Sequence, residues 1–107
     1  MPVYNKLVRD LIPDIIKAQG KSLKTEVLDT ETYYKELRKK LQEEQSEYMN
    51  SSADAEAVEE LADMLEVIYA LAAVHGASEA ELNAIRMKKA EARGGFKERI
   101  FLVEADR

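Results

Sequence analysis

The feature that most constrains the fold is the segment Leu61–Val74, which reads LADMLEVIYALAAV. It spans about four helical turns and is largely apolar, so it must pack against another element to leave water. Two acidic residues, Asp63 and Glu66, interrupt it. A bare carboxylate in a core costs several kcal/mol, so each of these groups has to be ion-paired, hydrated or bound to a metal ion. The segment therefore predicts an amphipathic helix in which two acidic residues border the buried side and need a specific partner.

Two pairs of acidic residues have helical spacing. They are Glu44 with Glu47 and Glu60 with Asp63. Residues three apart lie within about 60° of each other around a helix, so each pair directs its carboxylates toward one point. If the two helices pack together, the carboxylates converge in a group that suits hard cations such as Mg²⁺ or Mn²⁺. The residues also allow a buried salt-bridge network with nearby basic side chains, namely Arg38, Lys39 or Lys40.

Breaks in the pattern divide the rest of the chain into helices. We expect a short helix that starts near Leu11 and ends at Gly20, and long helices over about 30–49, 53–75 and 78–93. Pro13 falls in the first turn of the short helix, where its missing N–H costs nothing.

Local signals also predict how these helices begin. Ser78 and Glu81 have the spacing of a capping box, and Ser51 or Ser52 is expected to cap the helix over 53–75. Residues 24–28 and 100–103 are β-prone and are expected to form short strands that could pair. The predicted fold class is all-α with short β segments.

Composition and charge narrow the class of protein. At 107 residues the chain is expected to be a single domain, residues 1–107, and its apolar helix face favours a homodimer or homotetramer. The net charge of -5 disfavours nucleic-acid binding, and the absence of cysteine excludes thiolate metal sites and cysteine nucleophiles. The N-terminus has no apolar signal core, and no apolar run is long enough for a membrane span. We therefore expect a cytoplasmic protein.

Basic residues near both ends of the chain have two interpretations each. Lys6 and Arg9 precede the short helix, and Arg9 with Asp10 either orients a phosphate tail or ties the N-terminal segment to the bundle. Lys89 and Arg93 share a helix face and either present two cations to a polyphosphate or complement the negative end of the helix dipole.

The ordered combination of motifs resembles one family. Two acidic pairs in an EELAD setting, the start KLVRDLIP and the late KxxxRGGF are similar to small single-domain members of the MazG-type nucleoside triphosphate pyrophosphohydrolases. The resemblance implies a helical bundle completed by oligomerisation, with Mg²⁺ held by Glu44, Glu47, Glu60 and Asp63. It also implies cleavage of a nucleoside triphosphate between its α- and β-phosphates.

We accordingly predict roles for the remaining charged residues. Glu43 and Glu66 are the alternative candidates for the group that accepts a proton from the attacking water. Basic side chains bind the phosphates, namely Lys6, Arg9, Lys89 and Arg93. Phosphoribosyl-ATP pyrophosphohydrolase is the alternative within the enzyme class, and a non-catalytic helical dimerisation module is the alternative outside it.

Overall fold

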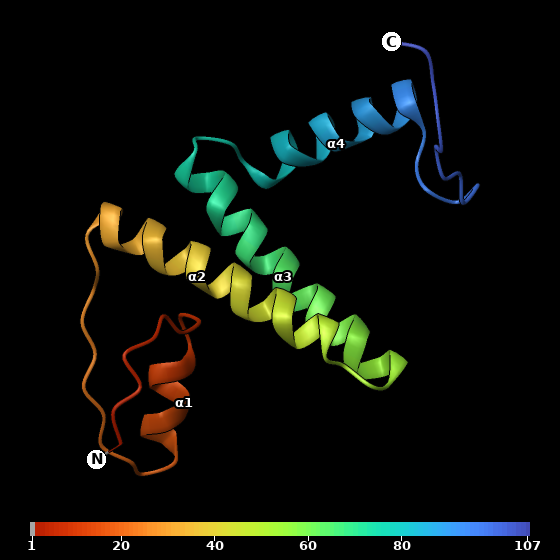
Figure 1. Cartoon of the computed structure of the whole chain (residues 1–107). Coiled ribbons are helices and arrows are strands. Elements are labelled where there is room, and N and C mark those ends of the chain that lie inside the picture. Colours follow the sequence, from red (N-terminus) through yellow and green to blue (C-terminus); the bar gives the residue numbers. More distant parts are fainter. Residues whose placement is uncertain (1) are drawn as a thin grey trace.

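The computed structural model describes residues 2–107 and contains helices in that range but no strand. The helices are α1 (Ile12–Ala18), α2 (Thr30–Met49), α3 (Asp54–Val74) and α4 (Glu79–Arg93). Helices α2 and α3 form an antiparallel pair, α4 continues from the far end of α3, and α1 lies to one side (Figure 1). The all-α class is confirmed, whereas the predicted strands at 24–28 and 100–103 are wrong.

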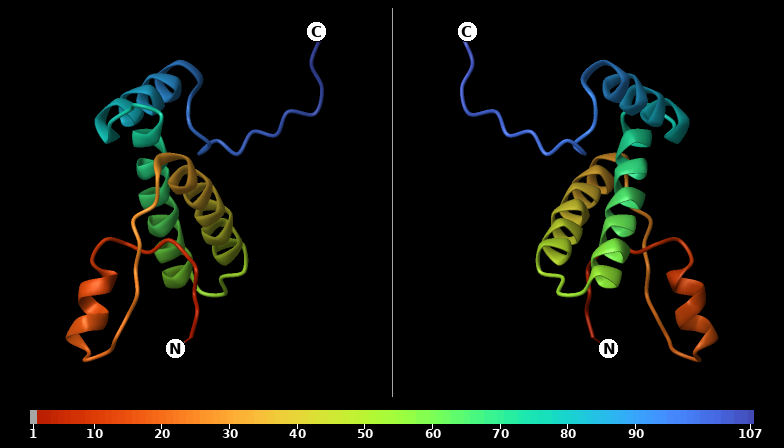
Figure 2. Two further views of the ribbon diagram at one scale, coloured as in Figure 1. Left: turned by 90° about the vertical axis from the view of Figure 1, so that its left-hand side faces the viewer. Right: turned by 90° about the vertical axis from the view of Figure 1, so that its right-hand side faces the viewer.

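The two segments predicted as strands have no partner to complete a ladder. Val27 is fully exposed, and Phe101 keeps 86% of its surface in contact with solvent. A strand needs a neighbour to receive its backbone hydrogen bonds, and β-propensity alone does not supply one. Figure 2 shows the C-terminal segment leading away from the helices, on the opposite side of the molecule from α1.

Contacts at the helix ends determine where α2 begins and where the turn to α3 lies. Asp29 precedes α2 and accepts a hydrogen bond from the Thr32 backbone N–H at 2.8 Å, which caps the helix. Helix α3 begins after Ala53 without a side-chain cap, so the predicted serine cap is wrong. Ser51 instead donates its hydroxyl to the Tyr48 carbonyl at the end of α2. The turn thus uses its serine to close the preceding helix.

Helix α4 starts as its sequence predicts. Ser78 and Glu81 form both hydrogen bonds of a capping box, which confirms the expected start. Gly76 precedes it with a φ of 85°, a conformation that glycine adopts without the steric cost of a side chain. Among the helices, α4 packs only against α3, and α1 packs against none.

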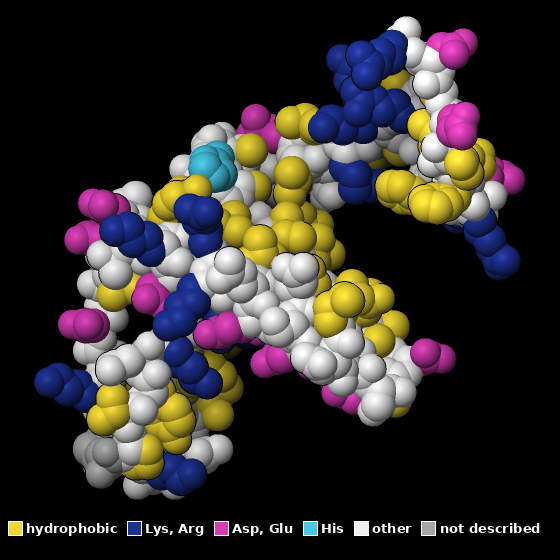
Figure 3. All heavy atoms as spheres, viewed as in Figure 1, with side chains coloured by type: hydrophobic (Ala, Val, Ile, Leu, Met, Phe, Trp, Pro, Cys, Tyr) yellow, Lys and Arg dark blue, Asp and Glu magenta, His cyan; other side chains and the backbone are white. Residues whose placement is uncertain are grey.

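The core of the described chain is small. Leu37 on α2 and Val67 on α3 are its buried hydrophobic residues, while Leu61 and Leu65 are each 45% exposed on α3. Hydrophobic side chains also gather on the surface where α3 meets α4 (Figure 3). A folded chain of this size normally covers more of its apolar helix surface. Within the described residues, no helix is both long and apolar enough to cross a bilayer.

Candidate metal centre

Three carboxylates meet where α2 and α3 pack side by side. Glu44 and Glu47 project from α2 and Glu60 from α3, and one oxygen from each lies within 4.8 Å of the others. Their environments differ: Glu44 is buried, Glu60 is half-buried and Glu47 is exposed. The helical spacing places Glu44 and Glu47 on one side of α2, and the antiparallel packing adds Glu60 from the facing helix. The predicted convergence of the two acidic helices is thus found for these residues.

The cluster leaves polar atoms without partners. Glu44 is 9% exposed, and its Oε2 makes no hydrogen bond. The Oε2 of Glu60 is also enclosed and unpartnered. Buried carboxylate oxygens normally accept hydrogen bonds or bind a cation, because leaving them bare forfeits their hydration. The donor set consists entirely of carboxylate oxygen, and it fits a hard divalent cation.

Crowding of like charges changes the proton affinity of the cluster. A hydrogen bond with Glu47, burial and the neighbouring negative charges raise the pKa of Glu60 to about 7. Burial raises the pKa of Glu44 as well, and the hydrogen bond and charge of Glu47 add to this effect. Without a cation the carboxylates therefore retain protons at a pH where isolated ones are ionised. A bound cation would remove the reason for this protonation.

Asp63, the remaining predicted ligand, has a different partner. Its Oδ1 accepts a hydrogen bond from Nη2 of Arg9 at 2.7 Å, which also forms an ion pair. Both side chains are partly solvated, with 58% of the Arg9 side chain and 41% of the Asp63 side chain exposed. The interpretation that Arg9 ties the N-terminal segment to the bundle describes this contact.

The predicted alternative network with basic residues of α2 does not form in the described chain. Within the described residues, no ion pair joins the cluster to Arg38, Lys39 or Lys40. Arg38 instead lies over the Tyr34 ring, with 5.5 Å between its guanidinium carbon and the ring centroid. Lys40 lies near enough for its charge to offset part of the rise in the pKa of Glu44.

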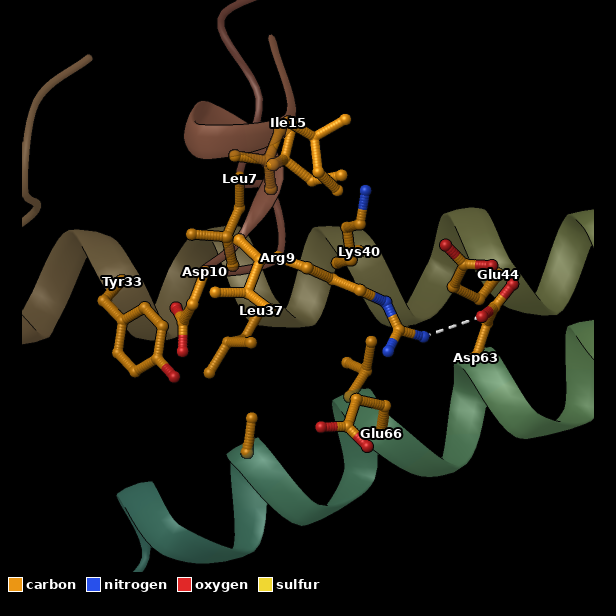
Figure 4. Close-up of a pocket in the computed structure, with 15 residues that line it drawn as sticks. Leu7, Arg9, Asp10, Ile15, Tyr33, Leu37, Lys40, Glu44, Asp63 and Glu66 are labelled. Atoms are coloured by element: carbon orange, nitrogen blue, oxygen red, sulfur yellow. Dashed lines mark hydrogen bonds and ion pairs between the residues drawn. The ribbon is translucent and has the colours of Figure 1, made fainter. Parts of the chain in front are cut away.

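A cavity of about 540 Å³ lies beside the cluster, between the N-terminal segment and the α2–α3 pair. Glu44 and Asp63 are at one end of it and Tyr33 is at the other (Figure 4). Apolar side chains form much of its wall, including Leu7, Leu11 and Ile15 from the N-terminal segment and Leu37 and Val67 from the helices. The cavity thus has a charged end and a largely apolar body.

The structure separates the other predicted site residues into two groups. Arg9 and Glu66 line the cavity. Lys40 also lines it, although its sequence position predicted only a salt bridge. Its position four residues before Glu44 was the available signal, since such residues share a helix face. Glu43 is exposed and lies outside the carboxylate cluster.

The predicted phosphate-binding residues of the chain ends lie elsewhere. Lys6 extends over the Tyr4 ring at 5.6 Å and does not line the cavity. Lys89 and Arg93 are exposed on α4, and Arg93 lines a separate hollow formed with residues 94–100. Within one copy of the chain, then, α4 adds no cation to the carboxylate cluster or its cavity.

Comparisons with protein-family models, with curated proteins and with solved structures find no match for this chain.

Proposed function

We propose that this protein is a Mg²⁺-dependent nucleoside triphosphate pyrophosphohydrolase in which Glu44, Glu47 and Glu60 hold the cation and Asp63 joins them. The observation that carries the proposal is the buried Glu44 carboxylate, which has an unpartnered Oε2 and lies beside two further carboxylates. The motif resemblance supplies the reaction, and Mn²⁺ is a suitable substitute because it favours the same oxygen ligands.

In this proposal, the residues around the cluster and the cavity have different roles. When bound, Mg²⁺ supplies charge neutralisation to the phosphate oxygens and acts as a Lewis acid. Lys40 and Arg9 line the same cavity and provide cationic groups toward a polyphosphate. Water attacks a phosphorus atom, the bond between the α- and β-phosphates breaks, and a monophosphate and pyrophosphate leave. Glu66 lines the cavity and Glu43 does not, so Glu66 is the better placed of the two to take the proton from the water.

We also propose that the protein works as a homo-oligomer. The partly exposed Leu61 and Leu65 on α3, together with the small core, leave apolar surface that a second copy would cover. Lys89 and Arg93 retain a role toward phosphate in this proposal if an α4 helix is supplied by that second copy. The cytoplasm remains the proposed location.

The test is a panel of nucleoside triphosphates incubated with purified protein and Mg²⁺, with the phosphate products identified. We expect monophosphate and pyrophosphate from at least one substrate. Glu44→Gln should lower kcat/KM by at least about a hundredfold, because changes to residues that only support metal ligands already cost about 10–100-fold. Glu91→Gln makes the same charge change on exposed α4 and should leave turnover unchanged.

Thermal unfolding separates the enzyme from the alternative dimerisation module. A cation that binds only the folded protein raises its apparent stability by mass action, so Mg²⁺ should raise the Tm of the wild type. Glu44→Gln should reduce that rise. Absence of any Mg²⁺ effect, together with no turnover on the panel, would favour the non-catalytic module.

A further inference from the structure

Few contacts join the N-terminal segment, residues 2–28, to the α2–α3 pair. Helix α1 packs against no other helix, and within the described residues the Arg9–Asp63 ion pair is the side-chain polar contact that joins residues 2–28 to the rest of the chain. Yet this segment supplies a wall of the cavity, through Leu7 and Leu11 among others. The position of that wall therefore depends on one solvent-accessible ion pair and on the apolar contacts around it.

Asp63 lies near enough to the carboxylate cluster for its charge to affect Glu44 and Glu60, and it also contacts the N-terminal segment. It follows Glu60 by one helical step of three residues, and it shares the charged end of the cavity with Glu44. Its carboxylate is nevertheless directed to the guanidinium of Arg9, as Figure 4 shows. A divalent cation that entered the cluster would be positive, as the Arg9 guanidinium is, and the Asp63 carboxylate would stabilise both. The two cations would therefore compete for Asp63.

We infer that Arg9 is the resident counter-cation of Asp63 in the metal-free protein, and that a divalent cation entering the carboxylate cluster displaces it and loosens the N-terminal wall of the cavity. This inference rests on the metal site of the proposed function. It makes Arg9 a positioning residue that couples metal binding to the N-terminal segment. The guanidinium that leaves Asp63 remains beside the cavity.

Mn²⁺ affinity, measured by electron paramagnetic resonance without nucleotide, tests the competition. Arg9→Gln removes the competing cation and should tighten Mn²⁺ binding by about two- to fivefold, which is the range that an exposed ion pair provides. Lys17→Gln makes the same charge change on exposed α1 and should leave the affinity at the wild-type value. Arg9→Lys should return the affinity toward wild type. Unchanged or weaker binding in Arg9→Gln would overturn the inference.

Hydrogen–deuterium exchange separates displacement from a general loss of positive charge. Mn²⁺ should speed exchange of wild-type amides over residues 7–16, because their tie to α3 is broken. In Arg9→Gln the same amides should exchange faster from the start and respond little to Mn²⁺. If Mn²⁺ leaves wild-type exchange unchanged or slows it, displacement is disproved.

The proposed function and this inference fail in different ways. Wild-type protein that binds Mn²⁺ and hydrolyses a nucleoside triphosphate, while Arg9→Gln matches it in affinity and exchange, retains the function and loses the inference. Wild-type protein that binds no Mn²⁺ loses both.

Discussion

The α2–α3 pair and the segments on either side of it are stabilised in different ways. The pair contains the buried hydrophobic residues Leu37 and Val67 and brings three carboxylates to one point. The N-terminal segment is joined to the pair by one ion pair and by apolar contacts around a cavity, and the C-terminal segment leaves Phe96 98% exposed. The contrast indicates that the carboxylate cluster is arranged by helix packing in a single copy of the chain. The groups around it depend on contacts that a ligand or a second copy can change.

The first and largest predicted effect tests whether the helix pair is complete without a second copy. Leu65→Lys, on the partly exposed face of α3, should break the proposed oligomer. Covering the exposed 45% of Leu65 contributes about 0.7–1.4 kcal/mol, and a two-fold interface counts it twice. A lysine charge at that interface adds a desolvation cost of several kcal/mol, so association should weaken by more than about a hundredfold. Light scattering at low micromolar concentration measures the change. Val27→Lys, at a fully exposed position, controls for the added charge.

A smaller effect is expected at α4, which contributes no residue to the carboxylate cluster within one copy of the chain. If the second copy brings α4 to the phosphates, Arg93→Ala should remove about 1.5–3 kcal/mol of transition-state stabilisation and lower kcat/KM accordingly. Mn²⁺ affinity should stay near wild type, because Arg93 lies outside the carboxylate group. Steady-state kinetics with the preferred nucleotide provide the measurement. Unchanged kcat/KM would remove Arg93 from the site.

The raised pKa values of Glu44 and Glu60 predict that the stability of the metal-free protein depends on pH. Glu60 titrates at about 7 in the folded chain against 4.5 for the unperturbed group, so the folded state retains a proton that the unfolded state has lost. Stability without metal should therefore fall as the pH rises through this window, and then level off. Melting curves in EDTA across the window test this sign. Glu60→Gln should flatten the dependence.

Magnesium should reverse the trend. Cation binding requires ionised carboxylates and releases their protons, so stabilisation by Mg²⁺ should grow as the pH rises. The same melting curves, repeated with saturating Mg²⁺, provide the comparison. Equal stabilisation at both ends of the window would argue against a metal site at Glu44 and Glu60.

The smallest predicted effect concerns the link between the two regions. Asp63→Asn in EDTA breaks an ion pair whose members are both partly solvated, and it also removes a negative charge from beside the cluster. The first change costs up to about 1 kcal/mol and the second offsets it, so the melting temperature should shift little. With Mg²⁺, the variant should be stabilised less than wild type and should lose activity. A large destabilisation in EDTA, with a normal response to Mg²⁺, would make Asp63 purely structural.

Short-range signals were sufficient to determine most helix boundaries from the sequence. The capping box at Ser78, the early Pro13 and the turn at Gly76 act over a few residues, and the predicted helices agree closely with α1 to α4. The acidic pairs were equally readable, because helical periodicity alone places their members on one face. The all-α class and the acidic faces of α2 and α3 follow from this local information, whereas the convergence of Glu44, Glu47 and Glu60 also requires the two helices to pack together.

Tertiary structure alone decided which charges meet. Arg9 pairs with Asp63 across a separation of 54 residues, in preference to the nearer basic residues of α2, because the path of the N-terminal segment brings it there. Residues 24–28 and 100–103 have β-prone side chains but are not strands, since no neighbouring strand accepts their hydrogen bonds. Helix periodicity acts within a segment and can be read from its residues. Ion pairing and strand pairing depend on distant parts of the chain, whose positions are determined only when the whole chain folds.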